Sequence, residues 1–383
     1  MKRFALPVLV LFLASSMAFG EEPLQTQFGA KLYGKIKLDA AYDSARTDNG
    51  NFARWVESEA NNEDDDQFNM TARESRFGVW LYGPDVAGMD TKGRAEIDFY
   101  EGGAENKNRI MLRHAYIQLD WPDSDMSVLA GQTSDVISPL YISTINYIVG
   151  WWVGNIGYRR AQVRLTKNVD LGEDAGVILQ GAATRTIGDD WGESPGDTGE
   201  DSGFPTLQGR VAVQAPLLAE APACLGVSGH WGQEEYDADE FGDGEDFDSW
   251  SVNVDFHLPL MEQLGLKAEF FTGENLDAYL GGIAQGVNKV GMNEIASTGG
   301  WVALDVKPHD KWSCLIGASM DDPEDDDLNE GDRAKNTALF ANVMYSITEA
   351  LKTGVEVSLW DTDYVGGDNG DSIRGQGTLI YYF

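Results

Sequence analysis

The sequence predicts an all-β protein, a transmembrane antiparallel β-barrel of about 16 strands with long extracellular loops and short periplasmic turns. Three observations predict this class. Hydrophobic residues recur with a period of two, segments with this pattern repeat along the whole chain, and the connections between them alternate between long and short.

The composition narrows the class of protein before any motif is considered. The chain has 383 residues, with 63 acidic against 28 basic residues and a formal charge of −35. This balance argues against unassisted binding to nucleic acid or to an anionic membrane surface, because both require clustered positive charge. The 42% hydrophobic and 11% aromatic content argues against disorder, and two cysteines exclude a disulfide scaffold.

The first residues have the features of an export signal. Lys2 and Arg3 precede an apolar run over residues 4–13, which is shorter than the roughly 20 residues that a membrane-spanning helix needs. We therefore expect residues 1–20 to be a signal peptide and residues 21–383 to form one outer-membrane barrel domain.

The period of two is clearest over residues 31–42. Leu32 and Leu38 lie on one face of this segment, and Lys35 and Lys37 lie on the other. Such a strand can meet lipid with one face and an aqueous lumen with the other.

Sixteen segments of this kind occur, an even number that returns both termini to one side of a membrane. We expect a β-bulge in three of them, near residues 68, 110 and 176, because their apolar parity shifts midway. The segments begin near residues 31, 68, 92, 110, 125, 157, 176, 205, 224, 249, 264, 299, 311, 336, 351 and 374.

The connections support the same count. Those after even-numbered segments are mostly short, such as 121–124 and 348–350, and a soluble β-sandwich or propeller has no reason to alternate in this way. The chain also ends on an aromatic strand, with Leu379, Tyr381 and Phe383 on one face, as expected of a client of outer-membrane assembly. The connections after odd-numbered segments are long and polar: 43–66, 101–108, 134–155, 187–204, 233–248, 273–298, 321–335 and 361–373.

The third long connection, residues 134–155, differs from the others. It has a single acid, Asp135, and many apolar residues, so it is expected to fold against the inner wall or to be buried at a subunit contact. A barrel of about 16 strands leaves an aqueous channel, and this connection is the candidate that narrows it.

Ten of the 15 arginines fall between Arg73 and Arg210. An arginine that faces lipid at the membrane midplane costs roughly 2–4 kcal/mol, which favours inward placement. Strand parity is ambiguous for Arg113. We expect a constriction biased toward anions, or, alternatively, arginines that only neutralise wall carboxylates such as Glu96 and Asp98. The candidate residues that line the pore or its constriction are Arg76, Arg94, Arg113, Arg160, Arg164, Arg210 and Asp135.

Five stretches of the sequence carry a resemblance to a known family: residues 32–39, 72–78, 112–116, 130–133 and 155–162. These stretches resemble the DcaP-like porins and, more broadly, the general trimeric porins of outer membranes. The resemblance implies a sixteen-stranded homotrimer in the outer membrane of a diderm bacterium, with an inward-folded third loop. It also implies passive uptake of small hydrophilic solutes, which are often anionic.

No linear catalytic motif is present, and we expect neither an enzyme nor a bound cofactor. Acidic runs such as 321–327 are interpreted as hydrated surface charge, with weak Ca²⁺ or Mg²⁺ binding as the alternative. The expected partners are outer-membrane lipid and small solutes, and no nucleic acid. Two alternative functions remain at this point: a structural or adhesive outer-membrane barrel with little channel activity, and a soluble secreted β protein.

Overall fold

The computed structural model describes residues 28–62, 65–102, 107–172, 174–188, 198–200, 202–236 and 245–383. The predicted signal peptide, residues 1–20, lies outside the described residues. Within these ranges, no helix is long and apolar enough to cross a membrane.

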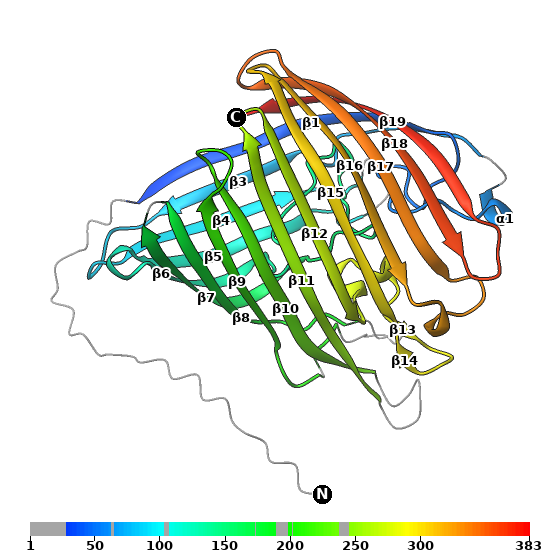
Figure 1. The fold of residues 1–383 in the computed structure, drawn as a ribbon, viewed down its shortest axis with the longest axis horizontal. Coiled ribbons are helices and arrows are strands. Elements are labelled where there is room, and N and C mark those ends of the chain that lie inside the picture. Colours follow the sequence, from blue (N-terminus) through cyan, green and yellow to red (C-terminus); the bar gives the residue numbers. More distant parts are fainter. Residues whose placement is uncertain are drawn as a thin grey trace, which may run out of the picture.

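Long antiparallel strands make up almost the whole fold (Figure 1). The first nine are β1 (Gly29–Asp43), β2 (Gln67–Thr71), β3 (Arg76–Tyr82), β4 (Asp90–Asp98), β5 (Met111–Trp121), β6 (Met126–Ser134), β7 (Arg159–Gly172), β8 (Ala175–Thr184) and β9 (Thr206–Pro216). The others are β10 (Pro222–Tyr236), β11 (Glu245–Met261), β12 (Leu264–Glu274), β15 (Ala296–His309), β16 (Trp312–Pro323), β17 (Arg333–Ser346), β18 (Leu351–Tyr364) and β19 (Gly370–Tyr382). A short hairpin, β13 (Val287–Asn288) and β14 (Asn293–Glu294), and one short helix, α1 (Glu59–Asn62), lie in connections.

These strands form a sheet of 17 segments that closes on itself, because β1 pairs with β19 on one side and with β2 and β3 on the other. Since β2 and β3 pair one after the other with the same strand, they are two parts of one barrel strand. The result is a closed 16-stranded antiparallel barrel, which confirms the predicted fold class and strand count.

Two of the three expected irregularities are present. The segment near residue 68 is broken at residues 72–75, between β2 and β3. In β5 the pairing shifts so that Arg113 is left without an opposite residue, and Arg113 and His114 are consequently both buried. The third expected irregularity does not lie in β8 itself: β8 pairs with β9 without a shift from Gly176 to Thr184, and the shift in its pairing with β7 leaves Leu171 of β7 without an opposite residue.

The two faces of the wall have opposite chemistry. On β1, Leu38 points outward and is 43% exposed, whereas its neighbour Lys37 points inward and is 3% exposed. The outer face of the other strands is apolar in the same way, and the inner face carries polar and charged side chains. The inward side chains are buried because loops cover much of the inner wall.

The seam between the chain ends is closed by the terminal aromatic residue. Gly34 and Phe383 exchange two backbone hydrogen bonds, of 3.0 and 3.2 Å between N and O. The Phe383 ring packs at 5.9 Å from Phe77, ring centre to ring centre. A Cβ at Gly34 would lie 2.6 Å from Phe383 Cζ and still closer to a backbone oxygen, so only glycine permits this contact.

The alternation of faces predicts different costs for the same charge on the two sides of the wall. Val211, in the middle of β9, is 52% exposed on the outer face and pairs with Leu179 and Val227, which also face outward. We expect Val211→Lys to lower the free energy of unfolding by about 2–4 kcal/mol. Reversible denaturant unfolding in lipid vesicles measures this cost.

Gln118→Lys is the matched control, because Gln118 lies on the inner face beside Asp120. It should change the stability by less than about 1 kcal/mol. Equal destabilisation by the two substitutions would contradict the assignment of faces.

Candidate functional site

The third loop (L3, residues 135–158) runs along the inside of the barrel. Successive strands contribute inward side chains that bind its backbone, and the sequence order of L3 follows the strand order of the wall. Its polar backbone groups are thereby satisfied away from bulk water. The acceptors are Gln208 of β9 for the Val136 amide (2.8 Å), Ser228 of β10 for Ser138 (3.4 Å), Glu269 of β12 for Leu140 (2.8 Å), and Glu356 of β18 for Ile145 (2.6 Å) and Asn146 (3.0 Å). The donors are Asn342 of β17 to the Ser143 carbonyl (3.0 Å), and Gln376 of β19 (3.3 Å) and Lys37 of β1 (2.9 Å) to the Ile145 carbonyl.

The apolar side chains of L3 face the same wall. Ile142 packs with Trp301 and Phe340, and Ile148 packs with Trp360. This burial explains why the third connection is nearly free of acids, since a charged residue at these positions would be desolvated without a partner. L3 therefore covers the wall from β9 round to β1.

Two further loops also fold inward, which the sequence analysis did not anticipate. In the first loop (L1, residues 44–66), Phe52 and Val56 join the apolar cluster around Ile148. In the sixth loop (L6, residues 275–295), Leu276 and Tyr279 are buried. The signal is a short apolar patch inside an otherwise polar loop, which the average composition of each loop conceals.

Strands β3 to β5 carry a cluster of arginines on their inner face. Three guanidinium groups converge on the buried carboxylate of Glu96: those of Arg113 (2.9 Å), Arg94 (2.7 Å) and Arg76 (3.4 Å). Arg113 also pairs with Asp98 at 2.6 Å. Three guanidinium groups against the two carboxylates of Glu96 and Asp98 leave a local excess of one positive charge.

Aromatic residues flank this cluster and were not identified from the sequence. The guanidinium of Arg94 lies 5.0 Å from the ring centre of Trp80 and 5.4 Å from that of Tyr33, which are cation–π distances. Tyr116 contacts Trp80 edge-on. The Tyr33 ring lies over Gly78, where a Cβ would come within 2.3 Å of it.

Three of the predicted site residues belong to buried ion pairs. Arg160 is 2% exposed and its Nε lies 2.9 Å from Asp135, while Arg210 pairs with Asp255. Asp135, the one acid of L3, is thus neutralised at the base of the loop. Arg164 is partly buried and donates to the Gln162 side chain at 2.9 Å.

Tyr147 connects L3 to the arginine wall. Its hydroxyl accepts from Arg113 at 3.2 Å and donates to Asp98 at 3.4 Å. Burial raises the pKa of Tyr147 to about 12, so the hydroxyl stays protonated at neutral pH. The predicted residues that keep partial exposure on this wall include Arg76 and Arg94, whose side chains are 24% and 23% exposed.

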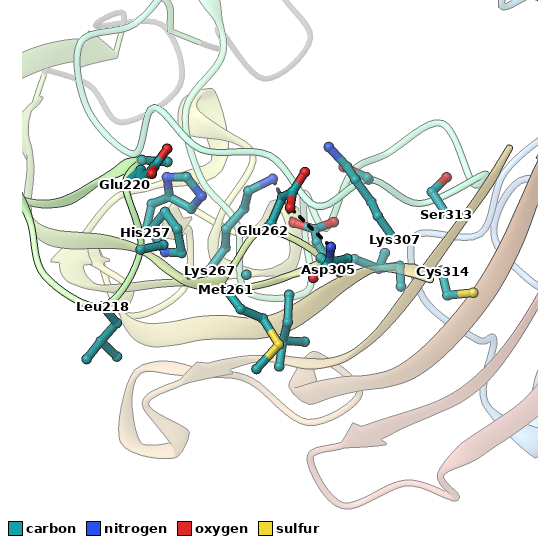
Figure 2. Close-up of a pocket in the computed structure, with 18 of the residues that line it drawn as sticks. Leu218, Glu220, His257, Met261, Glu262, Lys267, Asp305, Lys307, Ser313 and Cys314 are labelled. Atoms are coloured by element: carbon teal, nitrogen blue, oxygen red, sulfur yellow. Dashed lines mark hydrogen bonds and ion pairs between the residues drawn. The ribbon is translucent and has the colours of Figure 1, made fainter. Parts of the chain in front are cut away.

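A large cavity of about 1240 Å³ lies at the short-turn end of the lumen (Figure 2). Ser143 of L3 borders it, and Lys267, Asp305 and Lys307 line it from the wall. Lys267 and Asp305 form an ion pair at 2.8 Å. The cavity is a water-accessible vestibule below L3.

A closed barrel of 16 strands with a charged lumen and inward loops defines the class of outer-membrane porins. Residues 17–212 match the family described as DcaP outer membrane protein, and the chain belongs to this family. It is therefore a multi-pass β-barrel channel of the outer membrane, and the alternative of a soluble secreted protein is wrong.

Solved structures show the same fold. The outer membrane channel DcaP of Acinetobacter baumannii superposes with a TM-score of 0.74 at 19% identity, over 93% of this chain and 97% of that chain. An anion-selective porin from Comamonas acidovorans superposes with a TM-score of 0.59 at 11% identity, over 93% of this chain and 100% of that chain. OmpT of Vibrio cholerae superposes with a TM-score of 0.54 at 12% identity, over 93% of this chain and 98% of that chain. No curated protein sequence matches the chain.

The anchors of L3 predict a defect in channel width. Glu356→Ala removes the acceptor for two buried amides, and each amide left without a partner costs about 1–3 kcal/mol. We expect L3 to leave the wall in part of the population and single-channel recordings in planar bilayers to show larger, noisier conductance steps.

Glu349→Ala is the control, because Glu349 is an exposed acid in a short turn. It should leave the recordings unchanged. Identical recordings from both variants and from the wild-type channel would contradict the anchoring role of Glu356.

Proposed function

We propose that this porin passes small hydrophilic solutes by diffusion and prefers anions. The observation that carries the proposal is the cluster of Arg76, Arg94 and Arg113 around Glu96, in which the side chains of Arg76 and Arg94 stay partly exposed. The opposing loop contributes no free acid, since Asp135 is paired with Arg160. The path between them is therefore lined by positive charge.

The electrostatic effect of a single arginine is large enough to favour one kind of ion over another. A unit charge about 4 Å from an ion in water changes the energy of that ion by about 1 kcal/mol, which is about a fivefold change in relative occupancy. The wall carboxylates reduce this effect without cancelling it. Basic side chains outnumber acidic ones along this wall and its edge on β1: Lys35, Lys37, Arg76, Arg94, Arg113 and Arg164 against Asp39, Glu74, Glu96 and Asp98.

The similar fold of a porin described as anion-selective agrees with this proposal. We further propose that the chain functions as a homotrimer. The apolar outer face supports an assembly in the bilayer, and one porin of similar fold is described in a trimer form. Unboiled detergent gels with chemical cross-linking should show a band at three times the subunit mass; a single monomer band would contradict the trimer.

A second function has one observation in its favour. L1, L3 and L6 all enter the lumen, as expected of a structural or adhesive barrel with little channel activity. Stepwise conductance in planar bilayers distinguishes the two functions, because a plugged barrel gives none. We propose no catalytic role for the protein, whether it acts as a channel or as a structural barrel.

The anion preference predicts the effect of removing the partly exposed arginines. In a KCl gradient, the wild-type channel should give a reversal potential of the sign expected for Cl⁻. Arg76→Ser combined with Arg94→Ser should lower the Cl⁻/K⁺ permeability ratio by about fivefold or more, because two positive charges leave the path.

Arg185→Ser is the matched control. Arg185 pairs with Glu200 in the fourth long connection, and both side chains are largely exposed. It should leave the reversal potential unchanged. A wild-type channel that prefers K⁺, or a double variant with the wild-type ratio, would contradict the assignment.

A further inference from the structure

We propose that L6 is a second positioning element of the channel, and that Tyr279 is the residue through which L6 holds both ends of L3. The inference rests on the L3-lined channel of the proposed function and is independent of its anion preference. Tyr279 does not touch the solute path, so it acts through L3.

Tyr279 is held between two side chains. It is 2% exposed, the Arg160 guanidinium lies 3.9 Å from its ring centre on one side, and the His230 ring is stacked at 3.8 Å. His230 is itself fixed on the wall by Ser251 at 2.7 Å and Ser249 at 3.0 Å. The ring of Tyr279 is therefore fixed to strands β7, β10 and β11.

Arg160 connects this stack to the base of L3. It pairs with Asp135, the first residue of L3, and donates to the carbonyl of Ala278 in L6 at 3.0 Å. The two ends of L3 also bind each other, because Asp135 N donates to Tyr158 O and Tyr158 N donates to the Asp135 carboxylate. Any movement of Tyr279 is thus transmitted to both ends of L3.

The backbones of the two loops are joined as well. Gly157 N donates to Tyr279 O at 2.8 Å, and Trp152 N donates to Leu280 O at 2.7 Å. Leu276 and Tyr279 pack in one apolar cluster with Ile137 and Ile156 of L3. L6 therefore contacts the outgoing and the returning segment of L3.

L6 can act as a rigid support because the wall holds its backbone in an unfavourable conformation. Ile283 has a φ of 50°, which is strained for a β-branched residue. Its amide donates to Asp321 at 3.4 Å and its carbonyl accepts from Arg333 at 2.9 Å. These contacts hold the local conformation in place, so L6 keeps L3 at a fixed position relative to the wall.

The wall and L6 therefore divide the support of L3 between them. Side chains from β9 round to β1 hold residues 136–146, as described above, whereas residues 152–157 are held by L6 together with Asn336 of β17, which donates to the Trp152 carbonyl at 2.9 Å. The returning segment leads directly to Tyr158 and the arginine-bearing strand β7. The distance between this segment and the arginine wall depends on L6.

The first test compares Tyr279→Ala with Tyr279→Phe in single-channel recordings. Tyr279→Phe keeps the stacked ring and should behave as the wild-type channel. Tyr279→Ala removes a buried cation–π contact and should make conductance fluctuations roughly tenfold more frequent. The reversal potential should remain that of the wild-type channel, because no charge is removed.

The second test asks whether a disulfide cross-link between L3 and L6 reverses the effect of Tyr279→Ala. A Cβ at Gly281 would lie 2.8 Å from Ile156 Cγ2, so Ile156→Cys with Gly281→Cys places two thiols within reach. The native Cys224 and Cys314 are first replaced by serine. In the Tyr279→Ala background, oxidation should restore quiet channels and dithiothreitol should make them noisy again.

The outcomes separate this inference from the proposed function. A wild-type channel without conductance would overturn the proposed function. A conducting wild-type channel with equally quiet Tyr279→Ala and Tyr279→Phe variants would overturn the role of Tyr279 alone. A Tyr279→Ala channel that stays noisy after cross-linking would show that the effect does not pass through the contact between L6 and L3. Heat-modifiable gel migration confirms that each variant is folded.

Discussion

Every backbone amide and carbonyl inside a membrane barrel needs a hydrogen-bond partner, and the rest of this structure depends on that requirement. The strands satisfy it among themselves by closing the sheet. L3 has no regular structure, so side chains must satisfy it instead. Gln208, Glu269 and Glu356 do this from three different strands. The polarity of the inner wall is thus a requirement of the loop as much as of the water in the channel.

This requirement also separates the charges of the lumen into two groups. Glu269 and Glu356 accept backbone amides of L3, and cations are not their partners in the contacts described. The arginines gather on the opposite wall, around Glu96. Glu269 and Glu356 are thus occupied in holding L3, whereas the buried carboxylates of Glu96 and Asp98 pair with arginines.

The barrel could be predicted from the sequence because period-two alternation is a local property, and all sixteen strands were found where expected. The alternation along β9 does not show that Gln208 binds L3. That contact joins residues 72 positions apart, and its geometry exists only after closure. Arg113 was ambiguous because the bulge that turns it inward depends on the pairing with β4. Tyr33 and Tyr279 were missed because an aromatic residue in a strand or loop has no distinctive local pattern.

The order of the anchors along L3 has a consequence for folding. Ser143 and Ile145 are held by Asn342, Glu356 and Gln376, which follow them in the chain by 199, 211 and 231 residues. Contacts of such high sequence separation form late, because their loop-closure entropy is lost before they stabilise anything. L3 therefore docks only after β17 to β19 have joined β1. Until the last strand pairs with β1, the anchors of Ser143 and Ile145 are incomplete, and L3 cannot be held in its final position.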